Sequence, residues 1–396
     1  MSTGLQGQRA DALELAHHYV GGDGAAALGA LLDGFRQRHG GIAVEETQYD
    51  SHRLQIKSRI LRSDPPDVWT GWPGGEIEGY VDANTVADIT DLWEESDMLD
   101  QYRPVVADAS RVDGDLYAVP VTIHRINDLY VHADRASELG VDPTDASDPA
   151  ELASLLESAT AGTDAPGILL PMSDPFPVLQ LWEVSLLGRQ DHRTFQAITD
   201  GNAAANRSAI ADALEQVTAF ADLAPDESLY DDLTDANAEF VDGEVPVYPQ
   251  GDWAAGVFVE ETGFEFEREW HRVPFPGTES MYAVVMDAFI PSAESDSAAL
   301  ETFLQYVGSA DAQERFARNK GSIPPRKDAS MDGFSDFGRD QYRDLDRSRE
   351  QPQSITHGLS VTPAQLVDLK SAMAQFVDHW DVEATTNELI DVFDGD

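Results

Sequence analysis

Apolar and polar residues follow a regular order over the first fifty residues of the chain. The apolar run over residues 13–20 predicts a strand. Residues 25–39 carry leucine and phenylalanine at the spacing of one helix face, which predicts a helix that ends at the following pair of glycines. A second strand is expected over residues 42–47. This order is a β-α-β unit, and such units predict a parallel sheet in an α/β fold.

The loop after the first predicted strand holds the first candidate binding residues. Open α/β sheets bind ligands at the carboxyl ends of their strands, and His18, Tyr19 and Asp23 lie there. Residues 21–24, Gly-Gly-Asp-Gly, are expected to form a tight turn, and they lack the spacing of a dinucleotide-binding fingerprint. Tyr19 is equally compatible with a place in the core.

The α/β pattern continues along the rest of the chain. A third strand is expected at residues 68–69, Asp113-Gly114 is a hairpin signal, and residues 121–131 are extended and are expected to cross into a second lobe. Residues 281–290 form a nearly continuous apolar strand interrupted by Asp287, an acid that needs a partner when buried. Further helices are predicted over residues 54–61, 149–160, 177–187, 206–223, 234–242, 298–307, 312–317, 362–380 and 383–393.

Two residue types that suit a sugar stand together in the stretch Gly251–Gly256, which opens a predicted helix. Asp252 is placed to cap the amino terminus of that helix, and Trp253 offers a large flat apolar face. A carboxylate accepts hydroxyl protons of a sugar, and an indole covers the C–H face of its ring. A capped helix with a core tryptophan explains the same two residues without any ligand.

Length and charge narrow the classes of protein. The 396 residues predict about two domains, and a hydrophobic content of 42% is enough for sizeable cores. Asp and Glu number 73 against 26 Lys and Arg, which gives a formal charge of −47 and excludes binding to nucleic acid or anionic lipid by charge attraction. Acids scattered along the whole chain are typical of halophiles, whose molar salt screens the repulsion. Most carboxylates are then solvated surface, and the rare lysines are more informative.

The chain contains no cysteine, which excludes disulfides, thiolate nucleophiles and cysteine-bound zinc. Its first ten residues are polar, and no apolar run reaches the ~18–20 residues that span a bilayer. The sequence as given is therefore expected to be a mature or trimmed region and not a secretory precursor.

Several short motifs, each weak by itself, occur in a characteristic order. They are Asp-Pro-Pro-Asp-Val at 64–68, Ala-Asp-Ile-Thr-Asp-Leu at 87–92, Asp-Gly-Asp-Leu-Tyr-Ala-Val-Pro-Val at 113–121, Gly-Asp-Trp-Ala-Ala-Gly at 251–256, Phe-Pro-Gly-Thr at 275–278 followed by Asp287-Ala-Phe, Val-Gly-Ser-x-x-x-Gln at 307–313 and Lys-Gly-Ser-Ile-Pro at 320–324. Taken together, from about residue 13 to 393, the chain resembles the extracellular solute-binding proteins of sugar ABC importers. The resemblance is to the maltose-binding-like family and most of all to its glucose/mannose-binding branch.

The resemblance implies a fold and a division of the chain. The fold is the two-lobed type II fold of periplasmic binding proteins, in which each lobe is a mixed sheet flanked by helices and a hinged cleft holds the ligand. Mapped onto this sequence, lobe one comprises residues 1–121 and 281–322, and lobe two comprises residues 122–280 and 323–396. Hinge closure would then complete a site formed by both lobes.

The resemblance also implies which residues contact the sugar. Aromatic and histidine positions, hydroxyl-binding acids and one hydroxyl-donating lysine match His18, Tyr19, Asp23, Trp72, His124, Asp252, Trp253, Asp287, Lys320 and His357. The departures are His18, where relatives carry an aromatic residue, and Trp72, where they carry a histidine, and these leave the exact sugar open. Chemistry agrees with this set, because a neutral hexose needs charged hydrogen-bonding partners and aromatic faces. Lys320 is also explained as a cation at a helix end, and His124 and His357 as structural histidines.

The function implied by the resemblance is a receptor without enzymatic activity. It would capture a glucose-like hexose or a short oligosaccharide outside the cell membrane and deliver it to the permease and ATPase of an importer. No cofactor or metal is implied, and such receptors work as monomers, usually held by a lipid on an N-terminal cysteine that this sequence lacks.

Two other classes of protein are compatible with parts of the sequence. A glycoside hydrolase needs two carboxylates ~5–9.5 Å apart, and Asp23 and Asp287 are the candidates, although acid pairs arise easily in so acidic a chain. A metal-binding protein is disfavoured, because His17 and His18 are adjacent and no His/Glu cluster follows them. The chain has neither a Gly-x-Ser-x-Gly elbow nor a phosphate-binding loop.

Overall fold

The computed structural model describes residues 12–19, 22–49, 51–225, 231–259 and 263–395. The chain forms two compact units: unit 1 comprises Met1–His124 and Val285–Tyr342, and unit 2 comprises Arg125–Val284 and Arg343–Asp396. It therefore passes between the units three times. The resemblance places the three boundaries after residues 121, 280 and 322, so the largest difference concerns the third.

The core of unit 1 is a five-stranded mixed sheet with the order β2-β1-β3-β10-β6. Strand β1 pairs in parallel with β2 and β3, and β10 is antiparallel to β3. The predicted β-α-β unit is thus confirmed, and the antiparallel strand arrives from a distant part of the chain. The strands are β1 (Ala12–His17), β2 (Ala43–Gln48), β3 (Val68–Gly71), β6 (Val119–Arg125) and β10 (Val284–Pro291).

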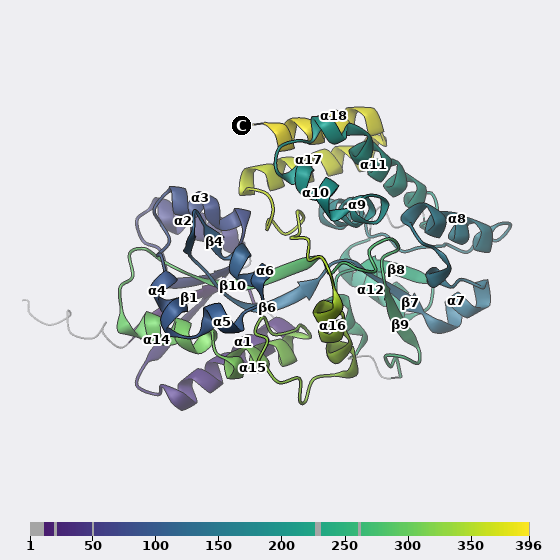
Figure 1. The fold of residues 1–396 in the computed structure, drawn as a ribbon. Coiled ribbons are helices and arrows are strands. Elements are labelled where there is room, and N and C mark those ends of the chain that lie inside the picture. Colours follow the sequence, from purple (N-terminus) through teal and green to yellow (C-terminus); the bar gives the residue numbers. More distant parts are fainter. Residues whose placement is uncertain (1–11, 20–21, 50, 226–230, 260–262, 396) are drawn as a thin grey trace, which may run out of the picture. The chain divides into compact units, whose positions relative to one another are not determined.

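Helices and one hairpin flank this sheet. Helix α1 (Gly22–Arg38) packs along α15 (Ala310–Lys320), although almost 300 residues separate them (Figure 1). The hairpin predicted at Asp113-Gly114 is confirmed by β4 (Arg111–Val112) and β5 (Asp115–Leu116). The remaining helices that lie in unit 1 or enter it are α2 (His52–Leu61), α3 (Gly75–Asp82), α4 (Thr90–Glu95), α5 (Met98–Gln101), α6 (Pro104–Ala109), α14 (Ala298–Val307) and α16 (Asp336–Arg347).

Unit 2 combines a small antiparallel sheet with a group of helices. The sheet has the order β8-β7-β9, formed by β7 (Asp128–His132), β8 (Val247–Gln250) and β9 (Trp270–Pro274). Helix α9 is buried on nearly all sides, and α11, α17 and α18 pack around it and each other (Figure 1). The helices are α7 (Ala133–Leu139), α8 (Pro149–Thr160), α9 (Pro175–Arg189), α10 (His192–Thr199), α11 (Arg207–Ala221), α12 (Leu233–Val241), α13 (Ala254–Phe258), α17 (Pro363–His379) and α18 (Val382–Asp394), with 3-10 turns η1 (Pro143–Asp145) and η2 (Ala204–Asn206).

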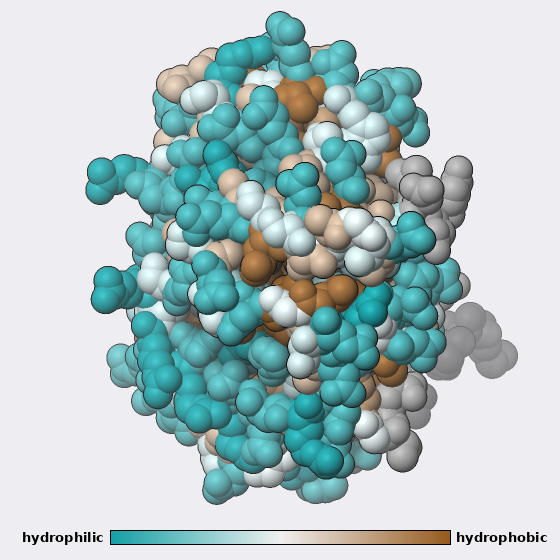
Figure 2. All heavy atoms as spheres, turned by 90° about the vertical axis from the view of Figure 1, so that its right-hand side faces the viewer, coloured by the Kyte–Doolittle hydropathy of each residue, from teal (hydrophilic) through white to brown (hydrophobic). Residues whose placement is uncertain are grey.

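Part of the large acidic content has a structural use. In unit 2, an aspartate side chain accepts backbone N–H groups at the amino terminus of five α-helices, which satisfies donors that the first turn leaves unpaired. These caps are Asp148, Asp174, Asp191, Asp232 and Asp381. Other acids remain at the surface, and hydrophilic residues cover most of the face drawn in Figure 2.

The predicted elements agree with the structure except at a few positions. The turn predicted over residues 21–24 is wrong for its described part, because Gly22 already begins α1, while residue 21 and the first ten residues lie outside the described part of the chain. The strand predicted from residue 281 begins only at Val284. Helices α10 and α16 were not predicted, and α16 is so polar that it shows no recurring apolar face. Among the described residues, no helix combines the length and apolar character needed to cross a bilayer.

Candidate functional site

Five of the predicted site residues of unit 1 lie around the carboxyl end of β1. The Tyr19 hydroxyl donates a hydrogen bond of 3.1 Å to Oδ2 of Asp287, and the rings of His18 and Tyr19 are 4.4 Å apart. Nζ of Lys320 lies 2.6 Å from Oδ2 of Asp23. The buried acid in the apolar strand β10 thus has the partner that its sequence position requires, and both Asp23 and Asp287 are engaged by donors.

Each of these side chains is placed by a different element. Asp23 lies in the first turn of α1 and Lys320 is the last residue of α15, so the packing of these two helices brings the pair together. Asp287 lies on β10, which reaches the sheet of unit 1 only after the chain has passed through unit 2. Burial, with the nearby charges of Asp287 and Asp23, raises the pKa of the Tyr19 hydroxyl well above its usual value, so it remains a donor.

A pocket of about 350 Å³ opens beside this cluster in unit 1. Its lining includes His18, His52, Thr70 and Trp72, so it contains two of the predicted residues. Nδ1 of His18 lies 3.0 Å from Oγ1 of Thr70, and Nε2 of His52 lies 2.7 Å from the Thr70 carbonyl oxygen. Burial lowers the pKa of His18, and it lowers that of His52 to about 4. Both imidazoles are therefore neutral at pH 7.

Trp72 is covered by a residue that the sequence did not single out. The guanidinium carbon of Arg53 lies 3.8 Å from the centroid of the Trp72 ring, and Nη2 of Arg53 lies 2.8 Å from Oε2 of Glu76. Arg53 also lines the pocket. The Trp72 face in contact with Arg53 is thus occupied by a cation whose charge is balanced by a buried acid.

His124 is the remaining predicted residue of unit 1. It lies on β6, next to β10 in the sheet, and is 4% exposed. The structure places it in the same sheet as Asp287, and its contact with a ligand stays a prediction.

The predicted residues of unit 2 form a second cluster. The rings of Trp253 and His357 are 5.2 Å apart, and Phe176, at the start of α9, packs edge-on against His357 at 5.0 Å. Phe176 and Trp253 are 6.4 Å apart. Three rings from distant parts of the chain thus provide apolar faces of the kind that cover sugar C–H groups.

The segment that carries His357 is held by one buried carboxylate. Glu183, in the middle of α9, accepts hydrogen bonds from Ser354 Oγ (3.1 Å), Ile355 N (2.8 Å), Thr356 N (3.0 Å) and Thr356 Oγ1 (2.7 Å). The Ser354 hydroxyl in turn lies 3.0 Å from Nδ1 of His357. Burial raises the pKa of Glu183 to about 6, although these four donors oppose the shift. Glu183 therefore positions His357 without contacting Trp253 in the described interactions.

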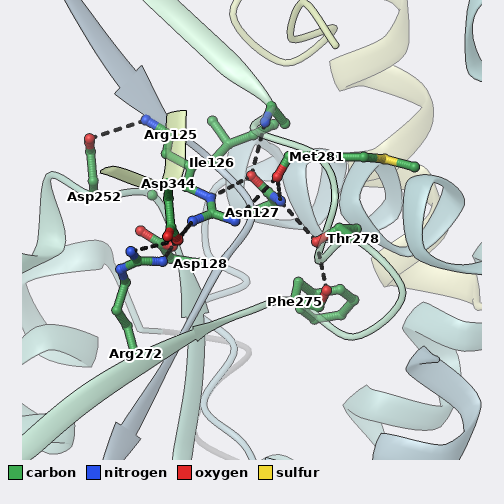
Figure 3. Close-up of polar contacts among 12 residues, drawn as sticks. Arg125, Ile126, Asn127, Asp128, Asp252, Arg272, Phe275, Thr278, Met281 and Asp344 are labelled. Carbon is green, nitrogen blue, oxygen red and sulfur yellow. Dashed lines mark hydrogen bonds and ion pairs between the residues drawn. The ribbon is translucent and has the colours of Figure 1, made fainter. Parts of the chain in front are cut away.

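Asp252 does not have the structural place predicted for it. Helix α13 begins after Trp253, and no side chain caps it, so the predicted Asp252 cap is wrong. The Asp252 carboxylate instead accepts the backbone N–H of Arg125 at 3.1 Å, while the Arg125 carbonyl accepts the Asp252 N–H at 2.9 Å (Figure 3). This double link fixes the turn that carries Trp253 to the end of β6, and it leaves the Asp252 side chain buried.

Arg125 continues this link into a buried ionic network. Its guanidinium lies 2.9 Å from Asp344 and 3.3 Å from Asp128, and Arg272 lies 2.8 Å from Asp344 and 3.2 Å from Asp128 (Figure 3). Nε of Arg125 also donates to Asn127, whose side chain accepts the N–H of Ala283 and donates to the carbonyl oxygen of Met281. Residues 125, 283 and 344 each lie within two positions of a passage of the chain between the units.

The residues missed by sequence reasoning differ in the signal they gave. Glu183 is the single acid of an otherwise apolar helix, and that position by itself indicates a buried carboxylate with partners. Arg53 and Phe176 gave no such signal, because an arginine or a phenylalanine near a helix start is common. Within the described parts of the chain, no group of His, Cys, Asp and Glu side chains is arranged to hold a metal ion.

Comparison with known proteins gives related sequences and similar folds. A family model described as bacterial extracellular solute-binding protein matches residues 30–336. The xylose/arabinose-binding protein XacG of Haloferax volcanii is 29% identical over 388 residues, which cover 96% of this chain and 83% of that protein.

Solved structures at lower identity share the fold. The bacterial solute receptor AcbH, described as exclusive for β-D-galactopyranose, aligns with a TM-score of 0.83 at 14% identity and covers 96% of this chain and 97% of its own. A chitin oligosaccharide-binding protein aligns with a TM-score of 0.83 at 15% identity, covering 97% and 98% of the two chains.

Proposed function

The protein belongs to the family of bacterial extracellular solute-binding proteins, which are not enzymes, and we propose that its solute is a sugar that it delivers to an ABC importer. The observation that carries this proposal is the pairing of charges beside the pocket of unit 1. Lys320 is paired with Asp23, Arg53 with Glu76, and His18 and His52 are neutral. Such a site offers strong hydrogen-bond donors and acceptors with little net charge, which suits the hydroxyl groups of a neutral sugar.

The sugar that we propose first is a glucose-like monosaccharide. Relatives and structural neighbours differ in this respect, since their described ligands include pentoses, a hexose and an oligosaccharide. A pentose or a short oligosaccharide is therefore the next candidate, and the choice between these ligands is a matter for experiment.

We propose that both units contribute contacts to the sugar. The proposed residues of unit 1 are His18, Tyr19, Asp23, Trp72, His124, Asp287 and Lys320, and those of unit 2 are Trp253 and His357, with Asp252 acting through the turn that it fixes. The engagement of Asp23 by Lys320 and of Asp287 by Tyr19 supports hydroxyl binding over hydrolysis, because a glycoside hydrolase needs one acid with a raised pKa.

The place of work and the partners follow from this proposal. The protein would act as a monomer on the outer face of the cell membrane and hand its sugar to the permease and ATPase of the importer. The net charge of −47 supports adaptation to concentrated salt, because molar salt reduces the Debye length to ~3 Å and so screens the repulsion among surface carboxylates.

A thermal-shift screen in concentrated KCl tests the proposed function. Glucose, galactose, mannose, xylose, arabinose, maltose and trehalose are added in turn, and a ligand that binds only the folded state raises the midpoint of unfolding. We expect a rise with one or two monosaccharides, none of which is consumed on long incubation. A midpoint that no sugar changes would contradict the proposal.

Replacing Asp287 with asparagine is expected to weaken binding of the sugar found in that screen by about 10–100-fold. The change removes the charge from an acceptor, and hydrogen bonds to charged groups contribute ~1.5–3 kcal/mol. Calorimetric titration measures the effect. Asp311→Asn is the matched control, since Asp311 pairs with Arg38 and Arg315 on helices away from the pocket lining. Equal affinities of the two variants would exclude Asp287 from the site.

A further inference from the structure

We propose that Arg53 restricts the pocket of unit 1 to a single sugar ring, by covering a face of Trp72 on which a second ring would otherwise stack. This inference rests on the proposed function, because it concerns the selectivity of the same site. Neither the resemblance nor the pattern of the sequence assigns a role to Arg53.

The contact between Arg53 and Trp72 is close and flat enough to exclude another ligand. A distance of 3.8 Å from the guanidinium carbon to the ring centroid is that of a planar group lying against the ring. A sugar that stacks through its C–H groups needs the same layer of space over the indole. The two groups therefore compete for one face of Trp72, and in this structure the arginine occupies it.

Glu76 keeps the arginine in this position. Its carboxylate lies 2.8 Å from Nη2 of Arg53 and is buried, whereas the Arg53 side chain is 42% exposed. Moving Arg53 away from Trp72 would leave Glu76 charged and buried without this partner, which is unfavourable. The arginine is consequently a fixed wall of the pocket and not a mobile surface side chain.

The position of Arg53 in the fold directs this wall into the pocket. Arg53 is in the first turn of α2, and its neighbours Ser51, His52 and Leu54 line the same pocket. Lys57, one turn further along the helix, is exposed and lies outside the lining. The two cations of one helix thus differ in whether they touch the site, which provides a matched pair for an experiment.

The effect on ligands follows from the space that remains. With Arg53 in place, the wall at Trp72 presents N–H donors, which suit the hydroxyl groups of one sugar. Without it, the uncovered indole face becomes a platform for a second ring. Arg53 therefore determines selectivity for monosaccharides over oligosaccharides, a property in which the structural neighbours of this chain differ.

The test compares affinities for one and two sugar rings. Calorimetric titrations of wild type, Arg53→Ala, Arg53→Lys and Lys57→Ala use glucose, xylose, maltose and xylobiose. We expect the disaccharide affinity of Arg53→Ala to rise at least about tenfold relative to its monosaccharide affinity. Arg53→Lys, which keeps the charge but loses the planar group, is expected to show a smaller rise, and Lys57→Ala none.

A second variant guards against a failure to fold. Arg53→Ala combined with Glu76→Gln exposes the same face of Trp72 without leaving a buried charge unpaired. An unchanged ratio of affinities in both Arg53→Ala and this double variant, while wild type binds a monosaccharide, would overturn the inference but leave the proposed function intact. Tight binding of disaccharides by wild type would also overturn it. Absence of any sugar binding by wild type would instead overturn the proposed function, and the inference with it.

Discussion

Replacing Asp128 with asparagine is expected to lower the free energy of unfolding by about 3–5 kcal/mol, because it breaks a buried ionic network from one side. Oδ1 of Asp128 lies 3.3 Å from Nη1 of Arg125 and 3.2 Å from Nη1 of Arg272, and all three side chains are almost fully buried. Asparagine keeps the shape but removes the charge, so Asp344 alone would face two guanidinium groups. Urea unfolding followed by circular dichroism measures the loss at constant KCl concentration.

An exposed ion pair in the same unit provides the control. Glu265 lies 2.6 Å from Arg268, but their side chains are 60% and 66% exposed, so Glu265→Gln is expected to cost less than about 1 kcal/mol. A loss no greater than this in Asp128→Asn would contradict the assignment of the network.

Acidification should weaken the same network. The cations Arg272 and Arg125 lower the pKa of Asp344, and they outweigh burial, which alone would raise it. A carboxyl whose pKa is lower in the folded than in the unfolded state stabilises the fold above its unfolded pKa, and this contribution is lost as the pH falls through the folded pKa.

Replacing Glu183 with alanine is expected to cost about 3 kcal/mol or more of stability and to weaken sugar binding. Four donors of residues 354–356 would lose their acceptor inside unit 2, and each unsatisfied buried group costs ~1–3 kcal/mol. The segment would then hold His357 less firmly against Trp253. Urea unfolding and calorimetric titration report the two effects separately.

The control and a conservative variant define what Glu183 does. Glu157→Ala removes an exposed glutamate from α8 and is expected to change neither quantity. Glu183→Gln is expected to have a smaller effect than alanine on both, since it keeps one acceptor oxygen. Full sugar affinity in both Glu183 variants would show that the carboxylate has no positioning role.

The pH dependence of Glu183 has the opposite sign to that of Asp344. Burial raises its pKa from 4.5 to about 6, so folding disfavours the ionised form. Wild type should therefore gain stability relative to Glu183→Gln as the pH falls from about 6 to about 4.5, and lose it as the pH rises through the same window.

Most elements of the fold could be predicted from the pattern of the sequence. Strand β1, helix α1 and strand β2 follow directly from apolar spacing, because each buries one face or side against the core. Helix α16 could not be found in this way, since it is largely polar. The motifs and their order indicated the family, which the match over residues 30–336 confirms.

The candidate site could be predicted only in part. Asp23, Asp287 and Lys320 were indicated by their residue types and their places in the pattern, and the structure brings each to a charged or hydroxyl partner. The covering of Trp72 by Arg53 was not predictable, because nothing local in the sequence says which side chain will lie on an exposed indole. Asp252 was assigned to a helix cap by a local rule, and a tertiary partner, the Arg125 backbone, replaced that role.

The sequence by itself determined the local elements, the acidic surface and the family, because periodicity, charge and motif order are properties of neighbouring residues. Only the tertiary structure decided which charges are paired. Lys320 meets Asp23 across almost 300 residues, and Arg125 meets Asp344 across more than 200. Such pairs depend on how helices and strands pack, and in a chain with 73 acids for 26 Lys and Arg the sequence offers too many possible partners for each cation.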